Sequence, residues 1–169
     1  MVSIRTVSEA DARRCHAVET AAFSAAAAAS FEKISNRIAN YPEGFLVLEC
    51  DGQICGFINS GCADQVDLAD EDFKGMTGHR SDAPHVVILS VAVDPTYHGR
   101  GFARMMMEAF VARMTGFGKR AIHLICRNIT LVFMNGLVTA MSGRQIQITV
   151  EWRGMKWSWN CSRASSFLA

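Results

Sequence analysis

Apolar residues recur along the chain in two patterns, and these patterns alternate from the first residues to about Asn128. Runs dense in β-branched and other apolar residues predict buried strands, whereas apolar positions three and four apart predict helices. The predicted strands are 3–7, 45–50, 53–60, 85–93 and 121–126. The second and third of them flank Asp51-Gly52, the dipeptide most typical of a two-residue hairpin turn.

Two helical regions lie between the predicted strands. The first follows Ser8, a favourable N-cap residue, and continues to about Ala39 with a break near Phe23–Ser24. The second is predicted over Arg104–Thr115 and is followed by glycines. The polar connection 61–84 follows neither pattern, and connections of this length inside a domain are usually functional or disordered. Strands and helices in this order predict a single α/β domain.

Composition narrows the class of protein. A chain of 169 residues fits one domain, 1–169, and its 50% hydrophobic residues supply a core. The formal net charge of +1, without any run of Lys or Arg, argues against nucleic-acid binding. No apolar stretch reaches the length of a membrane span, and the first residues lack the apolar segment of a signal peptide. We therefore expect a cytoplasmic protein with no nucleic-acid or membrane partner.

The cysteines do not form a metal-binding or disulfide pattern. The sequence contains no C-x-x-C, and no histidine pairs with a cysteine at the spacing of a zinc finger. Reduced thiols that are mostly buried are the expected state in a chain without an export signal, and no metal site is expected. The six residues are Cys15, Cys50, Cys55, Cys62, Cys126 and Cys161.

The turn between the strand 85–93 and the following helix carries the clearest chemical signal. It reads H-G-R-G-F-A, and its glycines Gly99 and Gly101 allow main-chain N–H groups to converge on a ligand. The N-terminus of the helix adds a positive field, and this combination binds phosphate. The motif is neither a Walker A sequence nor a dinucleotide fingerprint, because Arg104 replaces the last glycine of the latter. The glycines alone are equally consistent with a turn that binds nothing.

The sequence ILSVAVDPTYHGRGFARMMMEAF resembles the acetyl-CoA-binding motif of the GNAT N-acetyltransferases. In that family an apolar strand leads into V-x-P-x-Y, and [QR]-x-x-G-x-[GA] then opens a helix. Gly101 and Ala103 match, whereas His98 replaces the usual Gln or Arg. The likeness covers 3–128. The opening S-E-A-D, the E-x-A-A-F at 19–23 and the acidic connection are most similar to the arylalkylamine N-acetyltransferases and their bacterial relatives.

This resemblance implies a fold and a cofactor site. The fold would be α/β (α+β), the GNAT acyl-CoA N-acyltransferase fold, with a mixed, mostly antiparallel, splayed sheet and helices on both faces. Main-chain groups of Val91 and Val93 would pair with the pantetheine arm of acetyl-CoA where the fourth and fifth strands separate. The pyrophosphate would lie against N–H groups of the turn formed by His98, Gly99, Arg100, Gly101, Phe102 and Ala103.

The proton acceptor for an amine substrate does not follow from the resemblance. The animal enzymes use histidines on the fourth strand, and these positions fall on Val87 and Leu89 here. His85, at the start of that strand, is the candidate catalytic base acting through water, and a histidine without a catalytic role is the alternative. His123 is interpreted as a core residue, and the acidic residues within 64–72 are interpreted as a solvated loop.

Residues 129–169 differ from the rest of the chain in composition. They contain one acid, Glu151, against four bases, and they hold all three tryptophans. Here the family has a helix opening F-Y-x-[RK]-x-G-[FY], whose tyrosine is the general acid. This chain instead reads I-T-L-V-F-M-N-G at 129–136, with Met134 in place of the acid. A methionine cannot donate a proton, so the tail as written predicts a poorly stable and nearly inactive protein.

The genetic code offers an explanation for this tail. When the third base of each codon is read with the first two bases of the next, Met134-Asn135 forces a glutamate, and the neighbouring codons permit F-Y-E-R-F-G-Y, the missing helix opening. We therefore predict that one nucleotide was lost near codon 128–129, in the gene or in the written sequence. The alternative is a genuine ending, with a helix at Leu131–Ala140 and a strand at Gln145–Trp152.

The predicted function is acetyl transfer from acetyl-CoA to a primary amine of a small molecule, such as an arylalkylamine or a polyamine. The alternative is a catalytically inactive module that binds or senses acyl-CoA, and a different nucleotide phosphate at the same turn is a third reading. Phe23, Phe31 and the connection 61–84 are expected to line the amine side. The oligomeric state stays open, with a homodimer among the alternatives.

Overall fold

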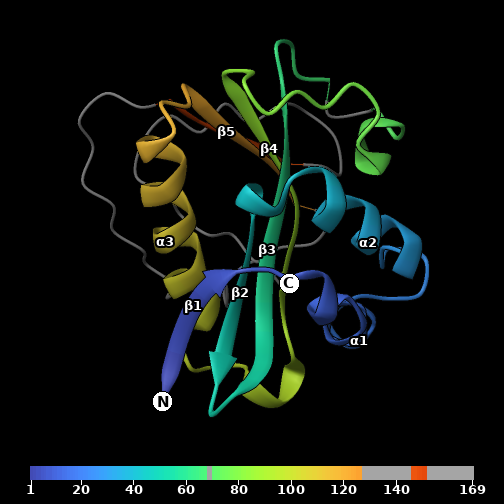
Figure 1. Cartoon of the computed structure of the whole chain (residues 1–169), viewed down its shortest axis with the longest axis vertical. Helices are drawn as coiled ribbons and strands as arrows, with labels where there is room; N and C mark the ends of the chain where they lie inside the picture. Colours follow the sequence, from blue (N-terminus) through green and yellow to red (C-terminus); the bar gives the residue numbers. More distant parts are fainter. Residues whose placement is uncertain (68–69, 127–145, 152–169) are drawn as a thin grey trace, which may run out of the picture.

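The computed structural model describes residues 1–67, 70–126 and 146–151. Its centre is a six-stranded sheet in the order β1-β2-β3-β4-β5-β6, in which only the β4–β5 pair is parallel (Figure 1). This confirms the expected mixed, mostly antiparallel sheet. The strands are β1 (Val2–Thr6), β2 (Phe45–Cys50), β3 (Gln53–Ala63), β4 (His85–Val93), β5 (Ala121–Cys126) and β6 (Ile146–Glu151).

Helices cover both faces of the sheet, as expected. Helices α1 (Ala12–Ala22) and α2 (Phe31–Asn40) lie on one face, and α3 (Phe102–Gly116) lies on the other (Figure 1). Each helix buries apolar side chains against its own face of the sheet, and this burial is the main stabilising contribution. The α1/α2 side is filled by Val18, Ile34, Ile38, Phe45, Val47 and Phe57, and the α3 side by Leu46, Leu48, Ile58, Met106, Phe110 and Met114.

The first helical region is two helices, and the predicted break near Phe23–Ser24 is confirmed, because α1 ends at Ala22. The alanine run at 25–29, which was expected to be helical, lies outside both helices. The carboxylate of Glu19, inside α1, accepts a hydrogen bond from the main-chain N–H of Ala29 (2.9 Å), which fixes the connection. Ser30 then caps α2 by accepting from the N–H of Lys33 (3.3 Å). These tertiary and capping contacts outweigh the helix propensity of alanine.

The other boundaries differ from the predicted ones by a few residues. The hairpin turn at Asp51-Gly52 is confirmed, with both residues in the left-handed region (φ 51° and 80°). Strand β3 extends three residues beyond the predicted end at Ser60, because Gly61 to Ala63 pair with β4. Helix α3 begins at Phe102 instead of Arg104. Short 3-10 turns lie at Glu9–Asp11 (η1), Pro42–Gly44 (η2), Phe73–Gly75 (η3) and Pro95–Tyr97 (η4).

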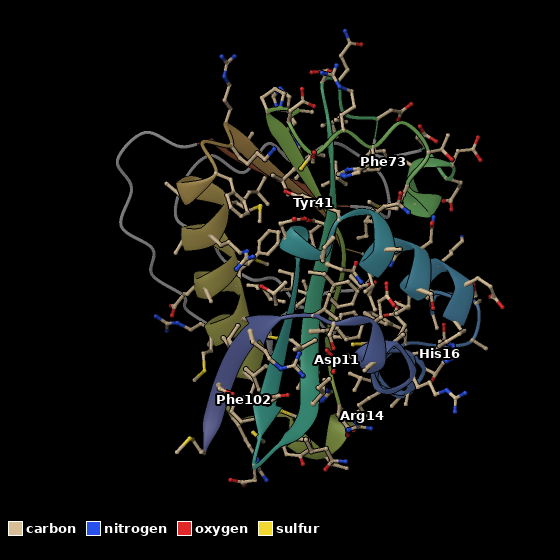
Figure 2. All side chains as sticks on the ribbon, in the orientation of Figure 1. Asp11, Arg14, His16, Tyr41, Phe73 and Phe102 are labelled. Carbon is tan, nitrogen blue, oxygen red and sulfur yellow. The ribbon has the colours of Figure 1, made fainter. Side chains whose placement is uncertain are left out.

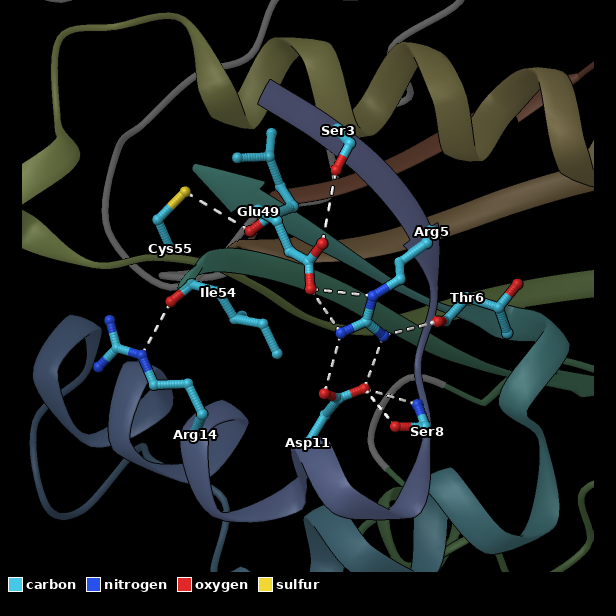
Figure 3. Close-up of polar contacts among 10 residues, drawn as sticks. Ser3, Arg5, Thr6, Ser8, Asp11, Arg14, Glu49, Ile54 and Cys55 are labelled. Atoms are coloured by element: carbon cyan, nitrogen blue, oxygen red, sulfur yellow. Dashed lines mark hydrogen bonds and ion pairs between the residues drawn. The ribbon is translucent and has the colours of Figure 1, made fainter. Parts of the chain in front are cut away.

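Arg5 joins three elements at the edge of the sheet. Its guanidinium, on β1, bonds both carboxylate oxygens of Asp11 (2.7 and 3.0 Å) and one oxygen of Glu49 on β2 (2.6 Å) (Figure 3). Asp11 in turn accepts from the N–H and hydroxyl of Ser8 (2.7 and 2.8 Å) at the beginning of η1. The bonds from Arg5 lower the pKa of Asp11 to about 2.

The thiols of Cys15, Cys50, Cys55 and Cys62 are free and buried, as the sequence predicts. Burial raises the pKa of Cys15 to about 12, which makes that thiol a poor nucleophile. Among the described residues no group of three His, Cys, Asp or Glu side chains could hold a metal ion. In the same part of the chain, every helix is too short or too polar to span a bilayer.

The tail contributes one described element. Strand β6 pairs antiparallel with β5, with Cys126 opposite Ile146 and Ala121 opposite Glu151. It lies within the strand at Gln145–Trp152 that the reading of a genuine ending predicts. The expected helix at Leu131–Ala140, the position of Met134 and the tryptophans fall outside the described residues.

Candidate functional site

Strand β4 has an edge that β5 covers only over its first half. The two strands pair from His85 opposite Ala121 to Ile88 opposite Leu124, and β4 then continues to Val93. Along Leu89–Val93 the described pairing is with β3 alone. The sheet therefore splays at Ile88, as the sequence predicts for the fourth and fifth strands, and the separation leaves a stretch of main chain available to a ligand.

A β-bulge lies where the two strands separate. Opposite β3, Asn59 pairs with Ser90 while the next residue, Ser60, pairs with Ile88, so Leu89 is the extra residue. The bulge changes which side chains face each side of the sheet. After it, Ser90 and Ala92 point toward α1 and α2, because Ser90 contacts Glu19 and Ala92 belongs to the α1/α2 core.

The main-chain groups of Val91 and Val93 point toward the open edge. The N–H of Asp94 donates to the carbonyl of Cys55 on β3 (2.9 Å), so main-chain groups at this position face β3. Because successive residues of a strand face opposite edges, those of Val93 and Val91 face the other way. Nε2 of the His98 imidazole lies 2.9 Å from the Val93 carbonyl oxygen, so the turn contacts this oxygen.

The turn after β4 presents N–H groups at the start of α3. Gly99 and Gly101 both have φ of 77°, a left-handed conformation that costs an L side chain about 1–2 kcal/mol. A Cβ at either position would meet no atom within 4 Å, so the backbone angle is what requires glycine. Gly101 is the N-cap, and the first intrahelical bond runs from Met105 N–H to its carbonyl (3.0 Å). The preceding N–H groups of the first turn lack helical partners and are open to an anion.

Side chains around the turn add positive charge at the surface. Arg100 is exposed and stacks over the ring of Tyr97 (5.1 Å to the centroid). The buried Phe102 packs into the α3 side of the core and anchors the end of the turn (Figure 2). Of the six predicted residues His98 to Ala103, the first four are exposed beside the open edge of β4, Ala103 is half-buried, and Phe102 is buried beneath them. The arrangement fits the phosphates and extended arm of an acyl-CoA, with phosphate at the turn and the arm along the strand.

His85 and His123 are neighbours across the paired part of β4 and β5. His85 Nδ1 lies 3.3 Å from His123 Nε2, and their ring centroids are 5.4 Å apart. His123 is 8% exposed, in keeping with its interpretation as a core residue, and its proximity to His85 was not predicted. His85 lies five residues before Ser90 on the extended strand β4. At that distance the His85 side chain cannot directly contact a group bound at the bulge.

A buried polar cluster lies directly behind the bulge, and the sequence analysis did not identify it. Ser90 Oγ donates to Glu19 Oε1 (3.1 Å), and Arg37 Nη1 reaches both Ser90 Oγ and Asn59 Oδ1 (3.4 Å each). Within the part of the chain that the structure describes, Glu19 Oε2 and Asn59 Nδ2 are buried without a hydrogen-bond partner. The sequence features that could have indicated this cluster are the polar residues Asn59 and Ser90 inside apolar strands and Glu19, the acid of E-x-A-A-F.

Burial shifts both ionisable groups of this cluster toward their neutral forms. It raises the pKa of Glu19, against the lowering effect of the bonds from Ala29 N–H and Ser90 Oγ. It also lowers the pKa of Arg37. Buried groups with shifted pKa values beside a ligand seat are typical of functional sites.

The connection 61–84 reaches this cluster at one point, because Arg37 donates from Nε and Nη2 to the carbonyl oxygen of Lys74 (3.3 and 3.1 Å). Asp64, Asp70 and Asp72 are exposed, and Asp64 pairs with Arg80 (2.7 Å), which supports the reading of a solvated loop. Of the two phenylalanines expected on the amine side, Phe23 is half-buried against the α1/α2 core. Phe31 is 39% exposed and contacts His16 edge to face (5.9 Å). Phe73 of η3 covers Val87 on the side of the sheet opposite Phe102 (Figure 2).

Comparisons with known proteins agree on the fold. The GNAT-like loading domain of CurA from Lyngbya majuscula has a TM-score of 0.71 at 22% identity, covering 78% of this chain and 67% of that one. The PaiA N-acetyltransferase of Thermoplasma acidophilum, solved with coenzyme A, has a TM-score of 0.65 at 14% identity, covering 90% of this chain and 99% of that one. A GphF GNAT-like decarboxylase solved with isobutyryl-CoA has a TM-score of 0.70 at 20% identity, covering 76% and 67%. No curated protein matches.

Comparison with models of protein families assigns the chain to a family as well as to a fold. The model of the acetyltransferase (GNAT) family matches residues 10–130, which include β4, the turn and α3 as well as the buried cluster. The match covers well over half of the chain and agrees with the resemblance found in the sequence. The chain therefore belongs to the acetyltransferase (GNAT) family.

Proposed function

We propose that this protein transfers an acetyl group from acetyl-CoA to a primary amine of a small molecule. The observation that supports it most is the continuity of the open β4 edge, Leu89–Val93, with the left-handed turn at the start of α3. An acyl-CoA needs both parts, since its amide-containing arm requires a strand edge and its pyrophosphate requires convergent N–H groups. Arylalkylamines and polyamines are the substrate classes to test first.

The reaction joins the amine nitrogen to the thioester carbonyl carbon and breaks the carbon–sulfur bond. The attacking amine must be neutral, so a proton acceptor is required, and the departing thiolate takes up a proton. The main-chain groups at the bulge would hold the thioester, and the cluster behind it would exclude bulk water. We propose His85 as the proton acceptor, through water, with His123 orienting its ring.

Glu19 is a second candidate for the proton. It lies one hydrogen bond from Ser90 at the bulge, much closer along β4 than His85. Glu19 Oε2 has no hydrogen-bond partner among the described residues. The raised pKa of Glu19 makes it a stronger base than an exposed carboxylate. Substitution of each side chain in turn separates the two candidates.

The proposal includes the tail. We propose that residues 129–169 are read one nucleotide out of frame and that the restored frame carries the tyrosine that protonates the thiolate. The family match ends at residue 130, close to the predicted break, which supports this proposal. The tail as written favours the alternative of an inactive acyl-CoA-binding module.

The deciding experiment measures binding and turnover separately. CoA and acetyl-CoA are titrated into the protein by calorimetry, and release of free CoA is followed with tryptamine, phenylethylamine and spermidine. Binding with amine-dependent release supports the transferase. Binding without release supports the inactive module, and absence of any CoA binding contradicts both.

A further inference from the structure

Helix α1 contacts β4 at both ends of its open stretch. Glu19, in the last turn of the helix, accepts from Ser90 at the bulge (3.1 Å). Arg14, in the first turn, donates from Nη2 to Asp94 Oδ2 (2.8 Å) directly after the strand. Residues 89–93, whose described strand pairing is with β3 alone, are thus bracketed by two side chains of one helix. Figure 2 shows Arg14 between α1 and the segment that follows β4.

Arg14 is itself fixed at a second point. Its Nε donates to the carbonyl oxygen of Ile54 on β3 (2.8 Å; Figure 3). Because Nη2 also bonds Asp94, the planar guanidinium spans β3 and Asp94 at once. Its side chain is 32% exposed and that of Asp94 is 13% exposed, so the pair is partly shielded from water. Such shielded, doubly bonded arginines hold a geometry more firmly than exposed ion pairs do.

Asp94 passes this constraint on to the turn. Its Oδ1 accepts from the N–H and hydroxyl of Thr96 (3.1 and 2.7 Å) and so caps η4, which leads directly into His98. Its own N–H bonds Cys55 on β3. The hydrogen bonds from Thr96 and then from Arg14 lower the pKa of Asp94, so the carboxylate is charged at neutral pH.

We propose that Arg14 is a positioning residue for acyl-CoA, acting through Asp94 on the open edge of β4 and on the turn at 98–103. A strand inside a sheet is held by neighbours on both sides, whereas beyond Ile88 β4 is held by β3 and by these α1 side chains. This inference rests on the proposed function for the identity of the ligand. The contacts of Arg14 with Ile54 and Asp94, here called the clamp, belong to the protein alone.

The test compares Arg14→Ala with Arg13→Ala, a matched removal of an exposed arginine at the adjacent position. Hydrogen exchange of main-chain amides is measured without ligand, and CoA affinity is measured by calorimetry. Arg14→Ala is expected to speed exchange in 89–101 and to weaken CoA binding by roughly tenfold, while exchange in β1 and β2 is unchanged. Arg13→Ala is expected to change neither quantity.

Two further variants separate positioning from general stability. Arg14→Lys cannot bond Ile54 and Asp94 in the same planar geometry, so it is expected to restore only part of the affinity. Asp94→Asn combined with Arg14→Ala should weaken CoA binding no more than the stronger single change, because both act through one contact. Where turnover is measurable, Arg14→Ala is expected to raise the KM for acetyl-CoA while kcat and the KM for the amine stay constant.

The outcomes distinguish this inference from the proposed function. Unchanged exchange in 89–101, or equal effects of the Arg13 and Arg14 variants, would overturn the clamp even if the protein binds CoA. Faster exchange in a protein that fails to bind CoA supports the clamp and contradicts the proposed function. Fully additive effects of the Arg14 and Asp94 variants would also overturn it.

Discussion

The carboxylate of Asp11 makes stability depend on pH in a defined direction. Its pKa falls from 3.8 to about 2 in the folded protein because Arg5 bonds it. A lowered pKa contributes stability above the unfolded value, and that contribution is lost as pH falls from about 4 to about 2. Because Arg5 is 38% exposed, the contribution is about 1–2 kcal/mol after solvent screening. Arg5→Ala should remove it, as measured by urea unfolding between pH 2 and 7.

The control for this prediction is Arg13→Ala, which removes an exposed arginine of α1. It should leave both the free energy of unfolding and its pH dependence within about 0.5 kcal/mol of the parent protein. If Arg5→Ala lowered stability equally at pH 2 and pH 7, packing of the arginine stem rather than its ion pairs would be responsible.

Glu19 and His85 are separable by the effect of their substitution on turnover. If His85 accepts the proton through water, His85→Asn is expected to lower kcat/KM by about 10²-fold, whereas Glu19→Gln should lower it far less. The opposite pattern would assign the proton to Glu19. The measurement is kcat/KM for the amine in each variant with saturating acetyl-CoA.

Glu19 also makes a prediction for stability that does not depend on activity. Burial raises its pKa above 4.5, so its favourable contribution is complete below that value and is lost as pH rises through the raised pKa. Glu19→Gln keeps the shape and the acceptor oxygen for Ala29 N–H but carries no charge. Its stability relative to the parent should therefore increase from pH 4 to pH 8 in chemical unfolding, and a constant difference would contradict a raised pKa.

The start of α3 depends on the left-handed conformation of its N-cap. Gly101→Ala should cost about 1–2 kcal/mol or distort the turn, because φ is 77° while no atom opposes the new Cβ. CoA affinity is expected to fall, since the N–H groups of the first turn would lose their alignment. Gly116→Ala is the matched control on the same helix, where a Cβ also meets no atom and φ is not positive. It should leave affinity unchanged in the same calorimetric titration.

Elements with a local signature were predictable from sequence, and those decided by distant contacts were not. The Asp51-Gly52 hairpin and the strand–turn–helix at 85–116 follow from turn chemistry and periodicity over adjacent residues. The alanine run at 25–29 was expected to be helical, because nothing local reveals that Glu19 holds the N–H of Ala29. The buried cluster likewise joins α1, α2, β3 and β4, and single-sequence patterns contain no information about such contacts.

The proposed reading frame of residues 129–169 can be tested on the expressed protein. The intact mass of the expressed protein and sequencing of its tail peptides decide whether residues 129–169 are as written. A protein with the restored tail is expected to be more stable and at least 10²-fold more active, because it regains an acid for the thiolate and the family's last helix. If the protein with residues 129–169 unchanged refolded with ordinary stability and full transferase activity, that result would contradict the proposed frame.

The splay between β4 and β5 has a consequence for association between molecules. Unpaired N–H and C=O groups are a template onto which a strand from another chain can add, and folded proteins restrict such templates. Here the open stretch is only five residues long, begins at a bulge and ends at Pro95, which cannot extend a ladder. A ligand arm lying along Leu89–Val93 would close it completely. If the proposed function holds, preparations saturated with CoA should therefore aggregate more slowly on warming than ligand-free ones.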